Sequence, residues 1–202
     1  MKIGLYFGTF NPIHIGHLII ANYMVEFSNL DQVWLVVTPH NPFKDKKTLL
    51  DNHLRLEMVH LATKNYPKLK PSNVEFHLPQ PNYTINTLVY LTEKYPKHQF
   101  SIIMGEDNLN SLHKWKNYEA ILEHYGVYVY PRFEAKSQIS EVISTSEKKK
   151  TIQHPNIHLV DAPIVEISAT FIRESIKNNK NIAPMLPEEV WKYIDHNLLY
   201  KK

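Results

Sequence analysis

The chain has 202 residues, of which 43% are hydrophobic and 21% are charged, and its formal net charge is +3. This length suffices for one domain with a buried core, and the composition argues against a disordered chain. The absence of cysteine excludes disulfides, thiolate metal sites and a cysteine nucleophile. The positive charge is mild, and the lysine run at 147–150 is more typical of a solvated surface turn than of a nucleic-acid site. We expect a single domain over residues 1–202 and no nucleic-acid partner.

The sequence shows neither a membrane segment nor a secretory signal. Its apolar runs have the length of strands, well below the roughly 20 residues that a membrane helix needs. The first ten residues, MKIGLYFGTF, lack the small-residue cleavage region of a secretory signal. These features predict a cytoplasmic protein with no membrane partner.

The first third of the chain alternates strands with helices. The apolar run at 2–7 predicts a strand, and the segment 15–27, apolar on nearly all sides, predicts a buried helix. The β-branched run at 32–38 is typical of a parallel strand covered on both faces. A Pro-rich loop at 39–47, long enough to suggest a function, precedes a helix that Asp51 caps and that ends at residue 63.

The same alternation continues along the rest of the chain. The segment 73–78 predicts a strand, and 84–95 predicts a helix with Ile85, Leu88 and Val89 on one face. The remaining elements are a strand, a helical stretch, two strands and two helices, at residues 99–105, 106–124, 126–131, 156–163, 168–178 and 187–200. Strands that alternate with helices predict an α/β fold with a parallel sheet built from right-handed βαβ units.

A parallel sheet of this kind binds its ligand at the carboxyl ends of its strands, near the point where the strand order reverses. The loops that follow four predicted strands, at 8–14, 38–48, 105–107 and 131–137, should therefore share one rim. The unusual residues of the sequence fall in these loops. We expect the functional site at this rim.

The segment GTFNPIHIGH at residues 8–17 has the features of a phosphate site. Gly8 ends the first predicted strand, and Gly16 lies at the opening of the first helix, where unpaired N–H groups and the helix dipole favour phosphate. His14 and His17 are three residues apart, so both rings could donate N–H groups to one phosphate. The residues alone also allow capping or core histidines and zinc ligands, although no other cluster supplies further zinc ligands. The segment is not a dinucleotide-binding fingerprint.

Two short motifs resemble the hallmarks of a nucleotidyltransferase superfamily. The first is H-x-G-H at residues 14–17, and the second is I-S-x-T-x-x-R, which reads ISATFIR at 167–173. The second motif suits phosphate, because Ser168 and Thr170 offer hydroxyls at a helix start and Arg173 can bind phosphate oxygens with two N–H groups. The resemblance implies that the two motifs together hold a triphosphate.

Three longer segments, at 82–88, 102–122 and 186–200, are similar to the bacterial nicotinate (nicotinamide) mononucleotide adenylyltransferase family. The similarity spans nearly the whole chain and implies a Rossmann-like parallel sheet flanked by helices in three α/β/α layers. It also implies transfer of the adenylyl group of ATP to nicotinate mononucleotide, giving nicotinate adenine dinucleotide and pyrophosphate in NAD biosynthesis. The choice between nicotinate and nicotinamide stays open at this point, as does the oligomeric state, a homo-oligomer included.

The resemblance further implies roles for individual residues. His14 and His17 form the catalytic pair, which stabilises charge on the ATP phosphates. The expected ATP-binding residues are Gly8, Thr9, His14, His17, Gly105, Asp107, Ser168, Thr170 and Arg173. The expected mononucleotide-binding residues are Lys44, Thr84, Trp115, Lys116 and Arg132. Among these, Trp115 would stack on the pyridine ring.

Some of these residues also have ordinary structural explanations. Trp115 could be a half-buried packing residue, Asp107 could cap the following helix, and Lys44 could be a solvated loop charge. The loop at 38–47 departs from the usual pattern of the family. The register around Lys44 therefore stays open.

The reaction that the resemblance implies needs no general base from the protein. The second pKa of the mononucleotide phosphate is about 6, so this group is largely dianionic at neutral pH. Positioning and charge neutralisation should supply most of the acceleration. We expect Mg²⁺ bound mainly through ATP phosphates and water, with no metal ligand from the protein. The alternatives are adenylyl or cytidylyl transfer to another phosphorylated acceptor, such as phosphopantetheine, and a non-enzymatic RNA-binding module.

Overall fold

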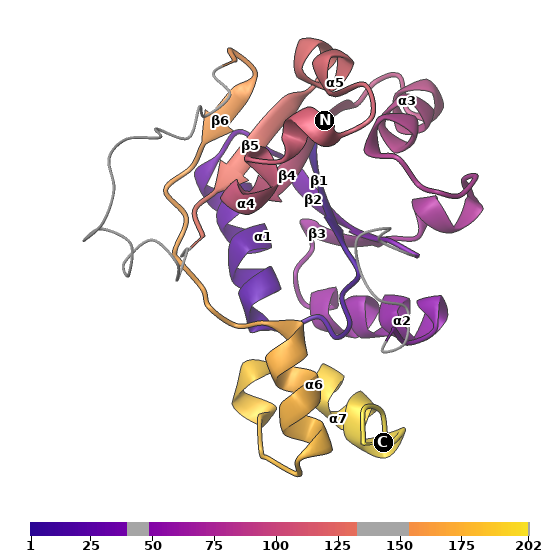
Figure 1. Ribbon diagram of the computed structural model, residues 1–202, viewed down its shortest axis with the longest axis vertical. Helices are drawn as coiled ribbons and strands as arrows, with labels where there is room; N and C mark the ends of the chain where they lie inside the picture. Colours follow the sequence, from indigo (N-terminus) through magenta and orange to yellow (C-terminus); the bar gives the residue numbers. More distant parts are fainter. Residues whose placement is uncertain (40–48, 133–153, 202) are drawn as a thin grey trace.

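A sheet of six parallel strands forms the centre of the structure, a computed structural model that describes residues 1–39, 49–132 and 154–201. The strands lie in the order β3-β2-β1-β4-β5-β6 (Figure 1). In chain order they are β1 (Lys2–Gly8), β2 (Gln32–Val37), β3 (Leu69–Ser72), β4 (Gln99–Gly105), β5 (Gly126–Tyr130) and β6 (Ile157–Leu159). The strand order reverses between β1 and β4, as in Rossmann-like folds. The predicted α/β fold class is confirmed.

Helices lie between the first five strands in chain order, and helices cover both faces of the sheet (Figure 1). The α-helices are α1 (Ile15–Phe27), α2 (Asn52–Thr63), α3 (Thr84–Lys94), α4 (Glu106–Leu109), α5 (Tyr118–His124), α6 (Ala169–Lys177) and α7 (Glu188–His196). Three short 3-10 helices complete the described elements: η2 (Val74–His77), η3 (Leu112–Lys114) and η4 (Ala183–Met185). Within the described ranges, no helix combines the length and the apolar character needed to cross a membrane.

Two hydrophobic cores lie on opposite faces of the sheet, because successive side chains of a strand point to opposite faces. On β2, Val33 and Leu35 belong to the core formed with α1, α2, α6 and α7. Their neighbour Val36 belongs to the core formed with α3, α4 and α5. Both faces of β2 are therefore buried, which explains its continuous apolar sequence. This arrangement gives the predicted three α/β/α layers.

The predicted strand at 73–78 is wrong. Residues 74–77 form η2, in which the Phe76 N–H donates to the Asn73 carbonyl at 2.9 Å. The edge strand is instead β3, which contains Pro71. A sheet tolerates proline at its edge, where the missing N–H leaves no ladder bond unmade. The buried side chain of η2 is Glu75, so burial there does not follow the apolar pattern that suggested a strand.

The predicted helices differ from the structure in three further places, one of which is the predicted helix at 187–200, since α7 ends at His196. The inner face of α3 carries Ile85 and Leu88 together with Leu91, whereas Val89 is 43% exposed. The predicted helical stretch at 106–124 is divided into α4, η3 and α5. The last break occurs at Asn117, the N-cap of α5, whose φ of 53° is left-handed and cannot continue a right-handed helix.

Candidate active site

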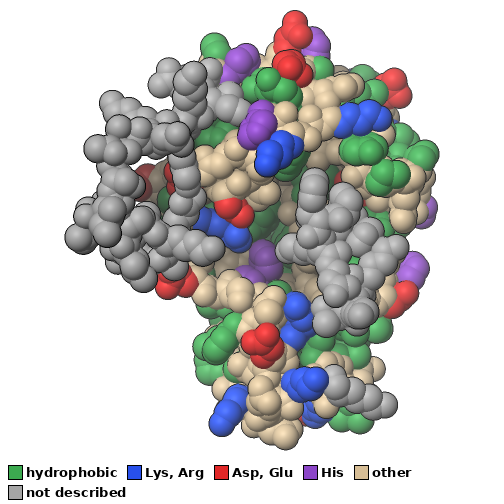
Figure 2. Space-filling model, in the orientation of Figure 1, with side chains coloured by type: hydrophobic (Ala, Val, Ile, Leu, Met, Phe, Trp, Pro, Cys, Tyr) green, Lys and Arg blue, Asp and Glu red, His purple; other side chains and the backbone are tan. Residues whose placement is uncertain are grey.

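The carboxyl ends of β1, β2, β4 and β5 lie at one rim of the sheet, as predicted, together with the N-terminus of α1. A narrow cleft opens there between the start of α1, the end of β5 and the segment that precedes α6; its lining comprises Tyr6, His14, Gly16, His17, Ile20, Tyr130, Pro131, Arg132, Val165 and Ile167. Figure 2 shows histidine side chains in a hollow near the middle of this face, with basic and acidic side chains beside them. The chain has three arginines, at 55, 132 and 173, and each of them contacts a loop of this rim.

His14 and His17 form a stacked pair at the start of α1. His14 is the N-cap, and its backbone N–H donates to Nδ1 of His17 at 3.2 Å. The two rings stack with centroids 3.7 Å apart. Because Nδ1 of His17 accepts a hydrogen bond, the proton of its neutral ring lies on Nε2, which makes Nε2 a donor. The two rings thus lie side by side at the start of α1, where free N–H groups of a helix can meet an anion.

His14 is buried, with 5% of its surface exposed. Burial and the nearby charge of Arg132 lower the pKa of His14 to about 4. The ring is therefore neutral at neutral pH, and its Nδ1 is buried with no hydrogen-bond partner among the described residues. A Cβ at Gly16 would lie 3.1 Å from this Nδ1 and 3.0 Å from Val165 Cγ1. Gly16 is thus required because the imidazole packs against the backbone of α1.

Gly8 has a structural role that the sequence did not predict. Its φ is not positive, and the left-handed residue of the loop is Phe10, with a φ of 45°. The Phe10 ring folds over Gly8, so that a Cβ there would lie 2.8 Å from Phe10 Cζ. Gly8 therefore makes room for a core side chain. Thr9, between them, contributes its carbonyl to a contact with Arg55.

The second motif lies at the start of α6 and contacts the first motif directly. Ser168 is the N-cap of α6, and its Oγ accepts from the Phe171 N–H at 3.2 Å. One terminal nitrogen of Arg173 donates to Thr170 Oγ1 at 3.2 Å, and the other donates to the Asn11 carbonyl at 2.9 Å. Segments 162 residues apart are therefore joined at one site.

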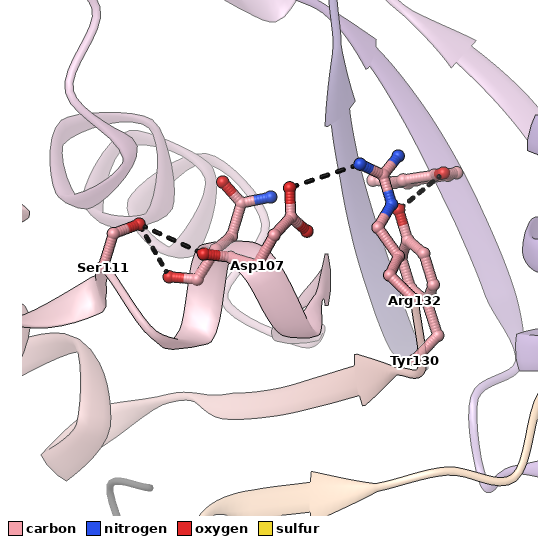
Figure 3. Close-up of polar contacts among 6 residues, drawn as sticks. Asp107, Ser111, Tyr130 and Arg132 are labelled. Carbon is pink, nitrogen blue, oxygen red and sulfur yellow. Dashed lines mark hydrogen bonds and ion pairs between the residues drawn. The ribbon is translucent and has the colours of Figure 1, made fainter. Parts of the chain in front are cut away.

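Asp107 and Arg132 form an ion pair over Gly105. Asp107 lies in the first turn of α4 and Arg132 follows β5, and their side chains point toward one another with an Nη1–Oδ2 distance of 3.2 Å (Figure 3). A Cβ at Gly105 would lie 2.5 Å from Asp107 Oδ1 and 3.1 Å from Arg132 Cδ. Asp107 does not cap α4, because the N-cap is Gly105. The sequence assigned these two charged residues to different substrates, whereas the structure brings them together.

The residues predicted to hold the pyridine ring lie at and near the start of α3. Thr84 is the first residue of α3, and its N-cap is Tyr83. The Lys116 ammonium lies 4.5 Å from the centroid of the Tyr83 ring, so the segment around Trp115 meets the start of α3. Trp115 is partly buried against the core on that face. Tyr83 was not predicted, and Lys44 lies outside the described residues.

Two further residues that the sequence did not indicate hold the first loop. Arg55, on α2, is fully buried, and burial lowers its pKa to about 10. Its five N–H groups all meet oxygen acceptors, namely those of Thr9, Thr38, Pro39, Leu50 and Asn52. Tyr200, after α7, donates its hydroxyl to Asn11 Oδ1 at 2.8 Å. The one sequence signal for Arg55 is the rarity of arginine, which the chain has at only two other positions, 132 and 173.

The donors at this rim suit phosphate better than a metal ion. Within residues 1–39, 49–132 and 154–201, no three histidine, aspartate or glutamate side chains are grouped to hold a metal. Asp107, an acidic group at this rim, pairs with Arg132. Imidazoles, hydroxyls and guanidinium groups bind phosphate oxygens, whereas Mg²⁺ prefers carboxylate, phosphate and water oxygens. The described side chains of this rim therefore offer donors for phosphate and no cluster of three acidic or histidine ligands for a metal ion.

Comparison with known proteins agrees with these motifs. Residues 5–175 match the cytidylyltransferase-like family. A probable nicotinate-nucleotide adenylyltransferase of Flavobacterium psychrophilum is 66% identical over the full length of both chains. That of Christiangramia forsetii is 60% identical over 99% of this chain and 98% of its own.

A solved structure shows the same fold. The Plasmodium falciparum nicotinic acid mononucleotide adenylyltransferase in complex with NaAD has a TM-score of 0.76 and 21% identity, covering 99% of this chain and 97% of its own. At that identity the likeness supports the fold alone, whereas the bacterial relatives are similar enough to show the family. This chain belongs to the cytidylyltransferase-like family and, within it, to the nicotinate-nucleotide adenylyltransferases.

Proposed function

We propose that this chain transfers the adenylyl group of ATP to nicotinate mononucleotide, giving nicotinate adenine dinucleotide and pyrophosphate. The observation that carries this proposal is the hydrogen bond between Arg173 and the Asn11 carbonyl, at 2.9 Å. It brings the H-x-G-H loop and the I-S-x-T-x-x-R helix start together, as a shared site for the ATP phosphates would require. The bacterial relatives, at 60–66% identity, bear the name of this activity.

The triphosphate of ATP would lie across the starts of α1 and α6. Both helix starts present N–H groups, and Arg173 adds a cation that can bind two phosphate oxygens. Arg173 would exchange part of its present contacts with Asn11 and Thr170 for phosphate. The neutral ring of His14 and the Nε2–H of His17 would donate hydrogen bonds to the α-phosphate and to the leaving pyrophosphate. Neither histidine needs to move a proton.

The reaction is an in-line displacement at the α-phosphorus. An oxygen of the mononucleotide phosphate forms a bond to this phosphorus, and the bond to the bridging oxygen of the pyrophosphate breaks. The attacking phosphate has a second pKa of about 6 and is already largely deprotonated at neutral pH. The protein therefore contributes alignment and stabilisation of negative charge, which are the main terms in phosphoryl-type transfers.

The adenosine and the acceptor would bind on the two sides of this centre. Asp107 would accept hydrogen bonds from the ribose hydroxyls of ATP, which would displace Arg132 from its carboxylate. The released guanidinium would then neutralise phosphate charge. Trp115 and the start of α3 at Thr84 would hold the pyridine ring, with the backbone at Lys116 donating to its carboxylate.

Magnesium would enter as part of the ATP substrate. Its ligands would be phosphate and water oxygens, in keeping with its reluctance to lose water. The protein residues named above would bind the remaining phosphate oxygens. Removal of Mg²⁺ with a chelator should therefore abolish turnover without lowering the Tm of the protein alone.

The direct test is turnover of the purified chain with ATP, Mg²⁺ and nicotinate mononucleotide. We expect stoichiometric pyrophosphate and nicotinate adenine dinucleotide, measured by coupled phosphate release and by chromatography. A kcat/KM with nicotinate mononucleotide higher than with nicotinamide mononucleotide supports the acceptor assignment. Turnover of phosphopantetheine with no turnover of either mononucleotide would overturn it, and so would a folded protein that turns over none of the three.

A further inference from the structure

The segment that follows α7 reaches the loop that follows β1. The Tyr200 hydroxyl donates to Asn11 Oδ1 at 2.8 Å, although the two residues are 189 positions apart. Asn11 is buried, and the Tyr200 ring packs against the core that contains Phe10 and Ile13. The contact therefore joins the end of the described chain to the buried side of the site loop.

The backbone at Leu198 and Tyr200 has an unfavourable conformation that tertiary contacts must stabilise. Leu198 and Tyr200 have φ values of 52° and 63°, in the left-handed region that bulky residues rarely occupy. The Leu199 N–H donates to the Ile194 carbonyl at 3.0 Å and ends α7. Unfavourable backbone conformations of this kind persist where surrounding contacts hold them and gather at functional sites. The hydrogen bond from Tyr200 to Asn11 is one of these stabilising contacts.

Asn11 accepts hydrogen bonds from two other parts of the chain as well. Its backbone carbonyl accepts from Arg173 at 2.9 Å, and its side-chain oxygen accepts from the Leu50 N–H at 3.4 Å as well as from Tyr200. Two positions earlier, the Thr9 carbonyl accepts from Arg55. Charges of Arg55 and Arg173 both act on the Tyr200 hydroxyl, so the tyrosine lies near the two guanidinium groups that hold the loop.

The histidine pair follows directly from this loop. His14 comes three residues after Asn11, and its backbone N–H fixes the His17 ring through Nδ1. A displacement of Asn11 therefore moves the N-cap of α1 and, with it, the ring that donates through Nε2. Small misplacements of donors matter here, because a shift of about 1 Å can lower a rate on the order of 100-fold.

We propose that Tyr200 is a positioning residue for adenylyl transfer, acting through Asn11 on the placement of His14 and His17. The tyrosine itself touches neither the substrates nor the reacting atoms. The proposal rests on the proposed function for its kinetic readout. Loss of one hydrogen bond of this kind lowers a rate about three- to tenfold.

The first test is Tyr200→Phe in the full chain, with Tyr193→Phe as the matched control. Both changes remove one tyrosine hydroxyl from the C-terminal region, but of these two tyrosines only Tyr200 has a described hydrogen bond to the site loop. We expect Tyr200→Phe to lower kcat about three- to tenfold with the KM for ATP changed less than about twofold. Tyr193→Phe should match the wild type. An unchanged kcat in Tyr200→Phe, whatever happens to its Tm, would overturn the proposal.

The second test asks whether Tyr200 acts through Asn11. In a double-mutant cycle, Asn11→Ala should lower kcat by itself, and Tyr200→Phe should then add less than about a twofold further loss. Equal effects of Tyr200→Phe in the two backgrounds would show that it acts by another route. That outcome would also overturn the proposal.

A third readout does not depend on turnover. Nitrogen NMR of the His17 imidazole should show a protonated Nε2 and an accepting Nδ1 in the wild type. Tyr200→Phe should shift these resonances, while Tyr193→Phe should leave them in place. Unchanged His17 resonances in Tyr200→Phe would contradict the proposal even in an active enzyme. If instead the wild type makes no dinucleotide, the proposed function fails, and the NMR comparison still tests the positioning.

Discussion

His14 should make the stability of this protein depend on pH within a defined window. Burial and the charge of Arg132 lower the pKa of His14 from 6.5 to about 4 in the folded protein. In the unfolded chain the ring regains a pKa of about 6.5. Between these two values the unfolded state binds a proton that the native state does not bind. The contribution of His14 is therefore fully present above pH 6.5 and is lost as the pH falls toward 4.

The size of this effect follows from the two pKa values. They differ by about 2.5 units, which corresponds to about 3.4 kcal/mol when the pH falls below both values. Between pH 7.5 and pH 5.0 the loss amounts to about 2 kcal/mol. For a chain of this length, such a loss lowers Tm by roughly 4–8 °C.

The assay is thermal unfolding at pH 7.5 and pH 5.0 of the wild type, His14→Asn and His124→Gln. Asparagine does not titrate and is a good N-cap, so His14→Asn removes the proton site while it keeps a cap for α1. The wild type should lose roughly 4–8 °C more than His14→Asn between the two pH values. His124 has a side chain that is 64% exposed, and its variant should keep the wild-type pH dependence.

Equal losses of Tm in the wild type and in His14→Asn would refute the reasoning, because His14 would then bind its proton equally well in both states. ATP provides a further check. Phosphate charge beside the ring should raise the pKa of His14, so the pH dependence should become smaller at saturating ATP. A pH dependence that does not change with ATP would place the phosphates away from His14.

Three further substitutions test other parts of the site. His17→Ala should lower kcat about 100-fold or more, as removal of a transition-state donor does, and a change confined to KM would limit His17 to binding. Arg55→Lys keeps the charge but offers three donors to five acceptors. Urea unfolding should therefore show a free energy of unfolding lower by about 2–4 kcal/mol. A decrease below about 0.5 kcal/mol would contradict the proposed role of the five guanidinium hydrogen bonds. Asp107→Asn should raise the KM for ATP about tenfold, with Tm nearly unchanged because both partners of its ion pair are half exposed. An unchanged KM would remove Asp107 from the ribose site.

Local sequence patterns predicted the elements that depend on neighbouring residues. The helix at 15–27 and the N-cap Asp51 appear in the structure as predicted, because apolar runs and caps act within a few positions. The same holds for Ser168, whose Oγ accepts from the N–H three residues later. The predicted strand at 73–78 failed because pairing at the sheet edge, rather than apolar pattern, selected the segment that contains Pro71.

The sequence by itself determined the alternation of strands and helices, the parallel sheet and the two phosphate motifs, since each is encoded over a short stretch. Only the tertiary structure decided which distant groups meet. Arg55 and Tyr200 reach the first loop across 46 and 189 residues, and Asp107 pairs with Arg132 across neighbouring strand ends. Such contacts depend on how the whole sheet is ordered. Burial in the folded protein lowers the pKa of His14. A short segment of sequence cannot produce this shift, because the low-polarity surroundings of the ring come from the packed fold.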